Sequence, residues 1–178
     1  MQKTREGFTV WLTGLSGAGK STIGMLLANE LKNRGMNVEF LDGDEVRAEL
    51  CQDLGFSPKD RLTNIQRVCY VTELLNRNGI SVVASFITPY HSMREYCRVR
   101  IRNYTEVYVK CPLETLIQRD GKGLYKKALT GEIKNFTGVS DVYEEPESPD
   151  LVIRTDLMAP RESMDRVLVM LRKKGVST

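Results

Sequence analysis

The chain has 178 residues, of which 41% are hydrophobic and 28% are charged, and its formal net charge at pH 7 is +3. This length is enough for one domain with a proper core and too short for two comfortable ones. The composition is that of an ordinary globular protein, and so small a charge fits an anionic small ligand but does not by itself indicate nucleic acid.

The N-terminal segment starts with basic residues, but its apolar run is too short and too interrupted for a signal peptide or a membrane span. The four cysteines form no C-x-x-C pair, and His91 is the only histidine that could join them in a metal site. We therefore expect reduced cysteines that mostly pack in the interior of a cytoplasmic protein, rather than a zinc site.

Apolar runs and helical periodicity alternate along the chain, with turn residues between them. In chain order they predict a strand at 7–14, a helix over 20–33, a strand at 38–44, a helix over 61–78 stopped by Gly79, a strand at 80–87, a helix over 90–103, a strand at 106–111, a helix starting near Pro112, a strand at 150–155 and a closing helix around 164–171.

Residues 121–150 lose this periodicity and contain several glycines and prolines, which predicts a mobile lid and loop. Strands that alternate with helices pair in parallel, and strands that are apolar on both faces indicate a sheet covered on both sides. The sequence therefore predicts an α/β three-layer sandwich with a mainly parallel five-stranded sheet, within one domain over residues 1–178.

A glycine-rich loop follows the first predicted strand. Residues 14–21, Gly-Leu-Ser-Gly-Ala-Gly-Lys-Ser, match G-x-x-x-x-G-K-[ST] at every fixed position, and a predicted helix follows. Backbone N–H groups of such a loop surround phosphate oxygens at the positive end of the helix dipole. Lys20 would reach the β- and γ-phosphates, and the Ser21 hydroxyl would ligate Mg²⁺. A chance match in a turn is the alternative, but the context favours a site for ATP with Mg²⁺.

The second predicted strand ends in two acids, Asp42 and Asp44. Ligands of open α/β sheets bind beyond the carboxyl ends of the strands, so both carboxylates should face the phosphates. One would hold Mg²⁺ waters and the other would take a proton from an attacking hydroxyl, while Arg47 would hold an anionic group of the acceptor. The alternative is an Asp-Gly turn with a capping aspartate.

The stretch "LGFSPKDRLTNIQR", residues 54–67, places Phe56 beside Arg61, Asn64 and Arg67. An aromatic ring beside arginines suits a stacked base and a nearby anion. A solvated helix start that is capped by Ser57 or Asp60 explains this composition equally well.

Residues 119–136 form a basic segment that ends in Phe136. In a nucleotide kinase, such a segment would close over the triphosphate and exclude water. A solvated basic helix is an equal alternative by charge alone. The cations of this segment are Arg119, Lys122, Lys126, Lys127 and Lys134.

Together, these strings resemble one family, adenylylsulfate kinase (APS kinase). The matching strings are "GLSGAGKST", "DGDEVR", "LGFSPKDRLTNIQR", "SFITPY", "RDGKGLYKKALTGEIKNFTG" and "YEEPESPD", in family order over residues 8 to about 156. The resemblance implies a P-loop kinase fold and transfer of the ATP γ-phosphoryl group to the ribose 3′-hydroxyl of adenosine 5′-phosphosulfate (APS). The products would be ADP and 3′-phosphoadenosine 5′-phosphosulfate (PAPS), as in sulfate assimilation.

The resemblance also implies residue roles. Asp44 would be the base, with Asp42 nearby and Lys20 at the phosphates, and Phe56 and Phe136 would enclose the acceptor adenine. The implied ATP-binding residues are Gly14, Ser16, Gly17, Ala18, Gly19, Lys20, Ser21, Thr22, Arg119 and Thr155. The implied acceptor-binding residues are Asp44, Arg47, Phe56, Arg61, Asn64, Ile87, Lys122, Gly123, Leu124, Phe136 and Thr137.

Four positions depart from the usual family pattern. Thr88 stands where the family often has serine, so a phosphoserine is excluded there, and Gln66 removes a cation. Ser140 takes the place of an acid, and His91 the place of an arginine. None of these residues is assigned to the chemistry, and we expect His91 to be a polar loop residue rather than a general base.

Two other functions remain open from the residues themselves. Another small P-loop kinase, acting on a nucleoside monophosphate or on a metabolite such as shikimate or gluconate, would share the glycine loop and Asp44. A regulatory module would bind ATP without catalysis. The expected partners are ATP, APS, a second copy of the chain and an ATP sulfurylase domain or protein, with no role for nucleic acid or membrane.

Overall fold

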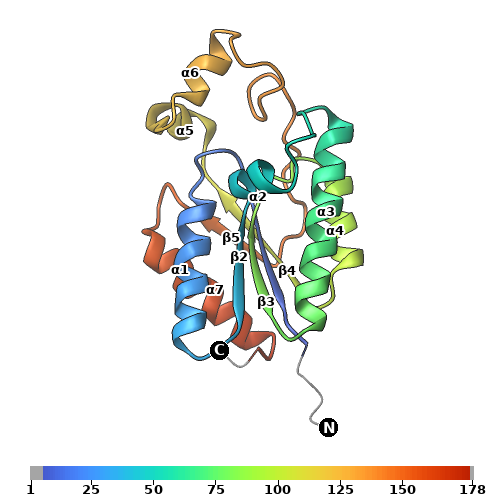
Figure 1. The fold of residues 1–178 in the computed structure, drawn as a ribbon. Helices are drawn as coiled ribbons and strands as arrows, with labels where there is room; N and C mark the ends of the chain where they lie inside the picture. Colours follow the sequence, from blue (N-terminus) through green and yellow to red (C-terminus); the bar gives the residue numbers. More distant parts are fainter. Residues whose placement is uncertain (1–5, 177–178) are drawn as a thin grey trace.

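The computed structural model describes residues 6–176. Within them, five strands form one sheet in the order β2-β3-β1-β4-β5, and every pair is parallel (Figure 1). The strands are β1 (Thr9–Thr13), β2 (Val38–Asp42), β3 (Ser81–Ser85), β4 (Tyr104–Lys110) and β5 (Leu151–Arg154). The predicted five-stranded parallel sheet is therefore confirmed.

Helices cover both faces of this sheet, as predicted for a three-layer sandwich (Figure 1). α1 and α7 lie on one face, α3 and α4 lie on the other, and α2, α5 and α6 lie beyond the carboxyl ends of the strands. The helices are α1 (Lys20–Asn33), α2 (Gly43–Glu49), α3 (Pro58–Arg77), α4 (His91–Arg100), α5 (Leu113–Arg119), α6 (Leu124–Leu129) and α7 (Pro160–Lys173).

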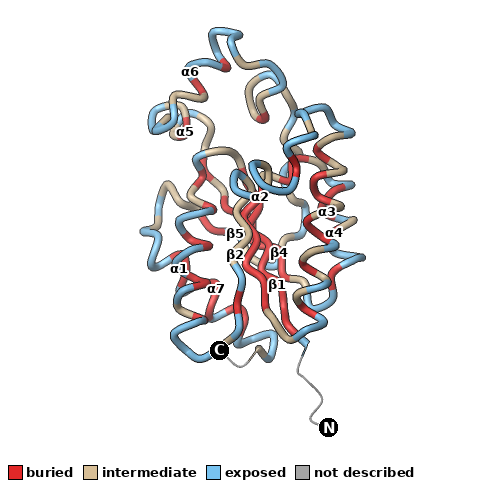
Figure 2. The backbone as a smooth tube through the Cα atoms, viewed as in Figure 1, coloured by how far each residue is buried: buried red, intermediate tan, exposed pale blue. Residues whose placement is uncertain are grey.

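Two apolar clusters lie on either side of the sheet, which is the most buried part of the fold (Figure 2). One cluster fills the space under α1 and α7 with residues such as Leu27 and Leu171. The other lies under α3 and α4 and contains Trp11 and Met93. Burial on both faces explains why β1 and β3 have only buried residues.

Several element ends follow the capping chemistry of the sequence. α1 begins and ends where predicted, and its N-cap Gly19 has a φ of 98°, which favours glycine. α3 starts at Pro58, three residues before the predicted start, because the Ser57 side chain accepts a hydrogen bond from the Asp60 N–H. Gly79, with a φ of 78°, follows the C-cap of this helix as predicted.

Two short helices differ from the sequence prediction. α2 occupies residues predicted to be the end of a strand and a turn, and none of its residues is buried. α6 lies within residues 121–150, which were predicted to lack periodicity. Helices of seven and six residues are too short to show an apolar stripe. No helix in the described part of the chain is both long and apolar enough to cross a membrane.

Gly24 allows α1 to lie close to the sheet. A Cβ atom at this position would lie 2.5 Å from the Phe40 ring and 3.1 Å from the Leu12 side chain. Such distances leave no room for a branched side chain unless the helix moves away from the sheet.

We therefore expect Gly24→Val to lower the free energy of unfolding by about 1–3 kcal/mol, as overpacking does in other cores. Urea unfolding of the purified protein measures this change. Met25→Val is the matched control, because Met25 is the next residue on α1 and is exposed. Equal stability of the two variants would contradict the close approach at Gly24.

Candidate active site

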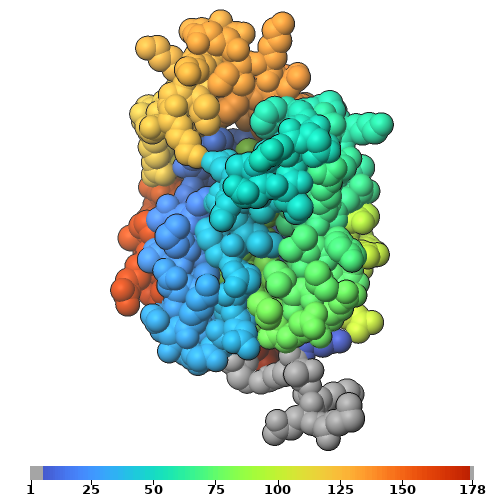
Figure 3. All heavy atoms as spheres, in the orientation of Figure 1, coloured from blue at the N-terminus to red at the C-terminus, as the bar shows by residue number. Residues whose placement is uncertain are grey.

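A cleft lies at the carboxyl ends of β1, β2 and β3, between the lid residues and the start of α3 (Figure 3). The sequence-predicted residues that line it are Ser16, Gly17, Lys20, Ser21, Asp42, Asp44, Arg47, Phe56, Arg61, Asn64, Ile87 and Lys122. The fold therefore brings predicted phosphate-loop, acidic and acceptor residues to one place. Residues that sequence reasoning did not place in the cleft are Gly43, Ile65, Ser85, Phe86, Thr88, Pro89 and Met93.

The glycine loop connects β1 to α1 beside the end of β4. A Cβ atom on Gly14 would lie 2.3 Å from the Val109 carbonyl oxygen, so only glycine fits this approach. Lys20 follows the loop and is buried, and its Nζ donates to the Leu15 carbonyl at 2.8 Å. Burial lowers the pKa of Lys20 to about 8, and the nearby Asp42 and Asp44 carboxylates oppose this shift.

Three hydroxyl and carboxylate groups meet at the start of α1. The Ser21 Oγ donates to Asp42 Oδ2 at 2.5 Å, and it lies 3.3 Å from Ser85 Oγ. The other oxygen of Asp42 caps α2 by accepting from the Asp44 N–H at 2.9 Å. The capping alternative from the sequence and the predicted place beside the glycine loop are therefore both correct for Asp42.

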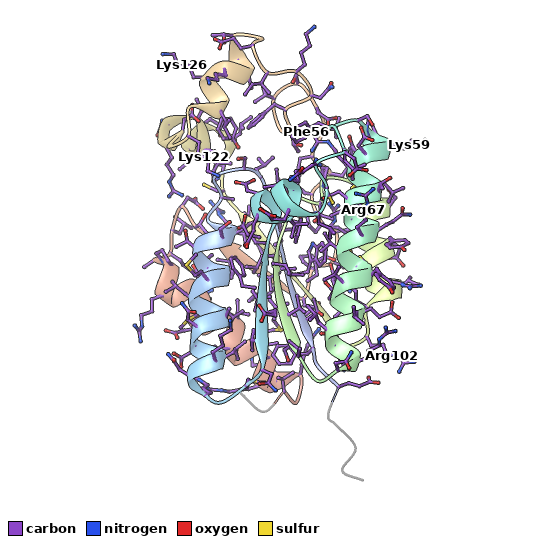
Figure 4. All side chains as sticks on the ribbon, viewed as in Figure 1. Phe56, Lys59, Arg67, Arg102, Lys122 and Lys126 are labelled. Atoms are coloured by element: carbon purple, nitrogen blue, oxygen red, sulfur yellow. The ribbon has the colours of Figure 1, made fainter. Side chains whose placement is uncertain are left out.

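Asp44 and Lys122 form an ion pair across the cleft. Lys122 Nζ lies 2.6 Å from Asp44 Oδ2, and both side chains are largely exposed. Hydrogen bonding to Asp44 raises the pKa of Lys122. Figure 4 shows Lys122 near α5 and Phe56 across from it, beside the start of α3. The predicted base therefore faces a cation from the predicted lid.

Phe56 is an exposed aromatic ring beside two arginines, as the sequence predicted. It is 55% exposed, and the guanidinium carbons of Arg47 and Arg61 lie 4.4 and 5.7 Å from its ring centroid. Arg47 also donates to the Gly55 carbonyl, and Arg61 Nε donates to the Phe56 carbonyl at 2.9 Å. Both arginines thus lie beside the ring that was expected to stack on adenine.

Phe136 does not line the cleft in this conformation. Its ring packs edge-on against the buried Tyr125, with the centroids 5.1 Å apart. Arg61 links the start of α3 to the residue before Phe136, because Arg61 Nη2 donates to the Asn135 carbonyl at 2.6 Å. The Tyr125 hydroxyl in turn donates to the Ser16 carbonyl of the glycine loop at 2.8 Å.

Arg119 and Thr155 lie together beside the glycine loop, outside the cleft. Arg119 Nη2 donates to the Thr155 carbonyl at 3.0 Å, and the Thr155 hydroxyl donates to the Ala18 carbonyl at 2.8 Å. Both residues therefore lie next to the loop that was predicted to hold the phosphates. Thr22 lies in the first turn of α1, and its side chain is exposed.

The remaining predicted acceptor residues lie on the lid. Gly123 is the N-cap of α6, with a φ of 67°, and Leu124 begins that helix. Thr137 is buried, and its hydroxyl has no hydrogen-bond partner within residues 6–176. The same holds for Asn64 Oδ1 in the cleft. Buried polar atoms without partners are rare in folded proteins and suit groups that meet a ligand.

His91 and the cysteines lie outside the cleft. His91 begins α4, and its Nδ1 lies 2.9 Å from Arg94 Nη2. All four cysteines are buried and free, as expected. Among residues 6–176, no three His, Cys, Asp or Glu side chains form a metal-binding group.

Comparisons with family models, known sequences and solved structures all match this chain to the same family. The family model for adenylylsulphate kinase matches residues 6–154. The chain belongs to the adenylylsulphate kinase family. A probable adenylyl-sulfate kinase of Pseudomonas aeruginosa is 52% identical over 91% of this chain and 76% of that protein. The adenylyl-sulfate kinase of a Picosynechococcus species is 50% identical over 97% of this chain and 98% of that protein.

Solved structures support the same family. The Mycobacterium tuberculosis APS kinase in complex with AMPPNP and APS has a TM-score of 0.90 at 40% identity, over 94% of this chain and 98% of that chain. Shikimate kinase of Aquifex aeolicus has a TM-score of 0.59 at 17% identity, over 96% of this chain and 100% of that chain, which shows a shared fold alone. The expected P-loop kinase architecture is confirmed.

The pKa of Lys20 gives a test of the phosphate loop in this family member. Because the pKa of Lys20 is about 8, this side chain is neutral in half of the molecules at pH 8. A bound phosphate favours the charged form of Lys20. ATP binding should therefore take up about half a proton at pH 8 and almost none at pH 6.5.

Isothermal titration calorimetry in two buffers with different ionisation enthalpies measures this uptake. Lys20→Arg is the control, because a guanidinium stays charged at both pH values. Equal proton uptake by the variant and the unaltered protein at pH 8 would show that Lys20 is not the titrating group.

Proposed function

We propose that this cleft transfers the γ-phosphoryl group of ATP to the ribose 3′-hydroxyl of APS, giving ADP and PAPS. One observation carries the proposal: residues of the glycine loop and the acids at the end of β2 line the same cleft as Phe56, Arg61 and Asn64. The relative that was solved with AMPPNP and APS supports the same two ligands for this chain.

The donor side is the glycine loop. Its backbone N–H groups would hold the phosphates at the start of α1, and Lys20 would exchange the Leu15 carbonyl for a phosphate oxygen. Arg119 and Thr155 lie where the ATP adenine would leave the loop, since Thr155 is hydrogen-bonded to Ala18.

Ser21, Asp42 and Ser85 fit Mg²⁺, because their oxygen atoms meet within hydrogen-bonding distance and Mg²⁺ prefers oxygen ligands. Ser21 would ligate the ion directly, and Asp42 would hold it or its waters. When bound with ATP, Mg²⁺ neutralises charge on the phosphate oxygens. The acid that faces Ser21 is Asp42, the last residue of β2.

Asp44 would act as the base for the 3′-hydroxyl. Its carboxylate does not cap α2, because Asp42 does so, and Asp44 lines the cleft. Lys122 now neutralises it from the lid at 2.6 Å. We infer that residues 121–150 form a mobile lid and the loop that follows it, and that Lys122 of the lid moves from Asp44 to the γ-phosphate as ATP binds.

The acceptor adenine would lie between Phe56 and Phe136. Arg61 supports this arrangement, because it binds the carbonyl of Phe56 and the carbonyl of Asn135, next to Phe136. Arg47 would leave the ring face for the phosphosulfate, and Asn64 Oδ1 would accept from a ribose or adenine donor. Ile87, Gly123, Leu124 and Thr137 would complete the acceptor contacts.

Further proposals concern partners and location. A relative from Sorangium cellulosum is named a probable bifunctional SAT/APS kinase, and the match covers 29% of that protein. This name supports a sulfurylase as a domain or partner for chains of this kind. We also propose a homodimer, from family resemblance, and a cytoplasmic location, since the cysteines are free.

A direct assay tests the proposed reaction. Purified protein with MgATP should form PAPS and ADP from APS, and it should show far lower turnover with AMP, CMP, shikimate or gluconate. Activity only on an acceptor without sulfate would defeat the proposal in favour of another small P-loop kinase. ATP binding without any turnover would favour the regulatory module.

Asp44→Asn should reduce kcat by about 10²–10⁴-fold, because the amide cannot accept the proton, while the KM for APS changes little. Steady-state kinetics with APS varied at saturating MgATP measures both values. Glu45→Gln removes the neighbouring exposed carboxylate of α2 and should leave kcat unchanged. An increase in KM without a decrease in kcat would make Asp44 a substrate ligand instead.

A further inference from the structure

We propose that Arg94 is a positioning residue for the acceptor side of the cleft. It would act by holding two segments in place: the wall segment, residues 87–89, and the return segment, residues 143–145, which belongs to the last part of residues 121–150, before β5. The inference rests on the proposed function, because it assigns the wall segment to the acceptor APS.

Arg94 is a buried cation that joins these two segments. It lies on α4 with only 3% of its surface exposed. Its Nη1 donates to the Thr88 carbonyl at 2.8 Å, and its Nη2 donates to the Glu144 carbonyl at 2.6 Å. The planar guanidinium presents its donors in a fixed fork, so it fixes the relative position of both carbonyls.

A buried carboxylate balances the charge of Arg94. Glu106 on β4 is 2% exposed, and its Oε1 lies 3.8 Å from Arg94 Nε. Its other oxygen lies 2.7 Å from Nη2 of the more exposed Arg98. A buried guanidinium is costly without such a partner, and apolar residues would pack this site as well. The two carbonyl groups that Arg94 holds therefore point to a positioning role.

The wall segment has a conformation that needs support. Thr88 has a φ of 45°, which is rare for a β-branched residue, and it is buried. Its hydroxyl accepts from Trp11 Nε1 at 2.8 Å while its carbonyl accepts from Arg94. Ile87, Thr88 and Pro89 all line the cleft, so this conformation shapes the wall that the acceptor would touch.

The return segment is fastened to the wall at the same place. The Glu144 N–H donates to the Pro89 carbonyl at 2.9 Å, and the Glu144 carboxylate accepts from the His91 N–H. The Tyr143 ring lies 5.9 Å from the Arg94 guanidinium carbon. Arg94 thus donates one hydrogen bond to the wall segment and one to the return segment, although Glu144 lies 50 residues after Arg94 in the sequence.

The effect should be specific to the acceptor. Lys20 and Ser21, at the phosphates, have no hydrogen bond to Arg94 in the described residues, whereas the wall segment follows β3 directly into the cleft. Loss of the fork should let the wall move relative to Phe56 and Asn64. Misplacement of a bound substrate by about 1 Å can cost about 100-fold in rate.

Arg94→Gln tests this inference, because glutamine keeps a polar group of smaller size and loses the charge and the fork. We expect kcat/KM for APS to fall by about 10- to 100-fold, mainly through a higher KM for APS, with the KM for ATP nearly unchanged. Steady-state kinetics with each substrate varied gives both values, and thermal unfolding gives the stability.

Arg98→Gln is the matched control. Arg98 lies one turn further along α4 and binds the same Glu106 carboxylate, but it donates to neither Thr88 nor Glu144. This variant should lose stability through Glu106 while its KM for APS stays as in the unaltered protein. Equal increases in the KM for APS in both variants would overturn the inference, because loss of the Glu106 partner would then explain the effect.

Arg94→Lys keeps the proposal testable if Arg94→Gln fails to fold. The lysine keeps a charge near Glu106, but its single ammonium cannot reproduce the planar fork. It should fold and still show a raised KM for APS, and a normal KM would overturn the inference. Absence of APS turnover in the unaltered protein would instead defeat the proposed function itself.

Discussion

The parallel register of β2, β3 and β1 is the constraint on which the site depends. Asp42 is paired with Ser85, and Ser85 is paired with Leu12, so three strands end side by side at one edge of the sheet. The glycine loop then starts one residue after Thr13, and α2 starts one residue after Asp42. Because side chains alternate along a strand, a slip by one residue would turn Asp42 or Ser85 away from Ser21.

Within the cleft, each predicted ligand-binding cation already has a partner from the protein. Lys20 binds the Leu15 carbonyl, Lys122 binds Asp44, Arg61 binds the Asn135 carbonyl, and Arg47 lies over Phe56. Binding of a phosphate or a sulfate would therefore exchange partners rather than supply missing ones. The net affinity from each exchange is the difference between two interactions, so a well-formed site of this kind need not bind its substrates very tightly.

The sequence predicted local features well and long-range contacts poorly. α1 was predicted closely, because the glycine loop marks its start and the turn residues "RGMN" follow its end. α2 and α6 were not predicted, because neither is long enough for periodicity to appear. Motifs placed Lys20, Asp42 and Asp44 correctly beside each other. Ser85 could have been found from its place at the end of a predicted strand, since ligands gather at that edge.

No sequence motif or spacing indicated the roles of Arg94 and Tyr125. Their partners lie far away in the chain: Glu144 for Arg94, and Ser16 for Tyr125. Hydropathy and spacing report only on near neighbours, and an arginine on a short helix is most often solvated. The orientation of the Phe136 ring against Tyr125 was hidden from the sequence for the same reason.

The two oxygens of Asp42 have a consequence for how this position can vary. Oδ1 fixes the first turn of α2, which carries Asp44, and Oδ2 faces Ser21. Asparagine would preserve the cap but remove the negative charge, whereas glutamate would preserve the charge but lengthen the side chain beyond the cap. Residue 42 therefore meets two separate structural requirements, a capping oxygen for α2 and a negative charge beside Ser21, and aspartate satisfies both.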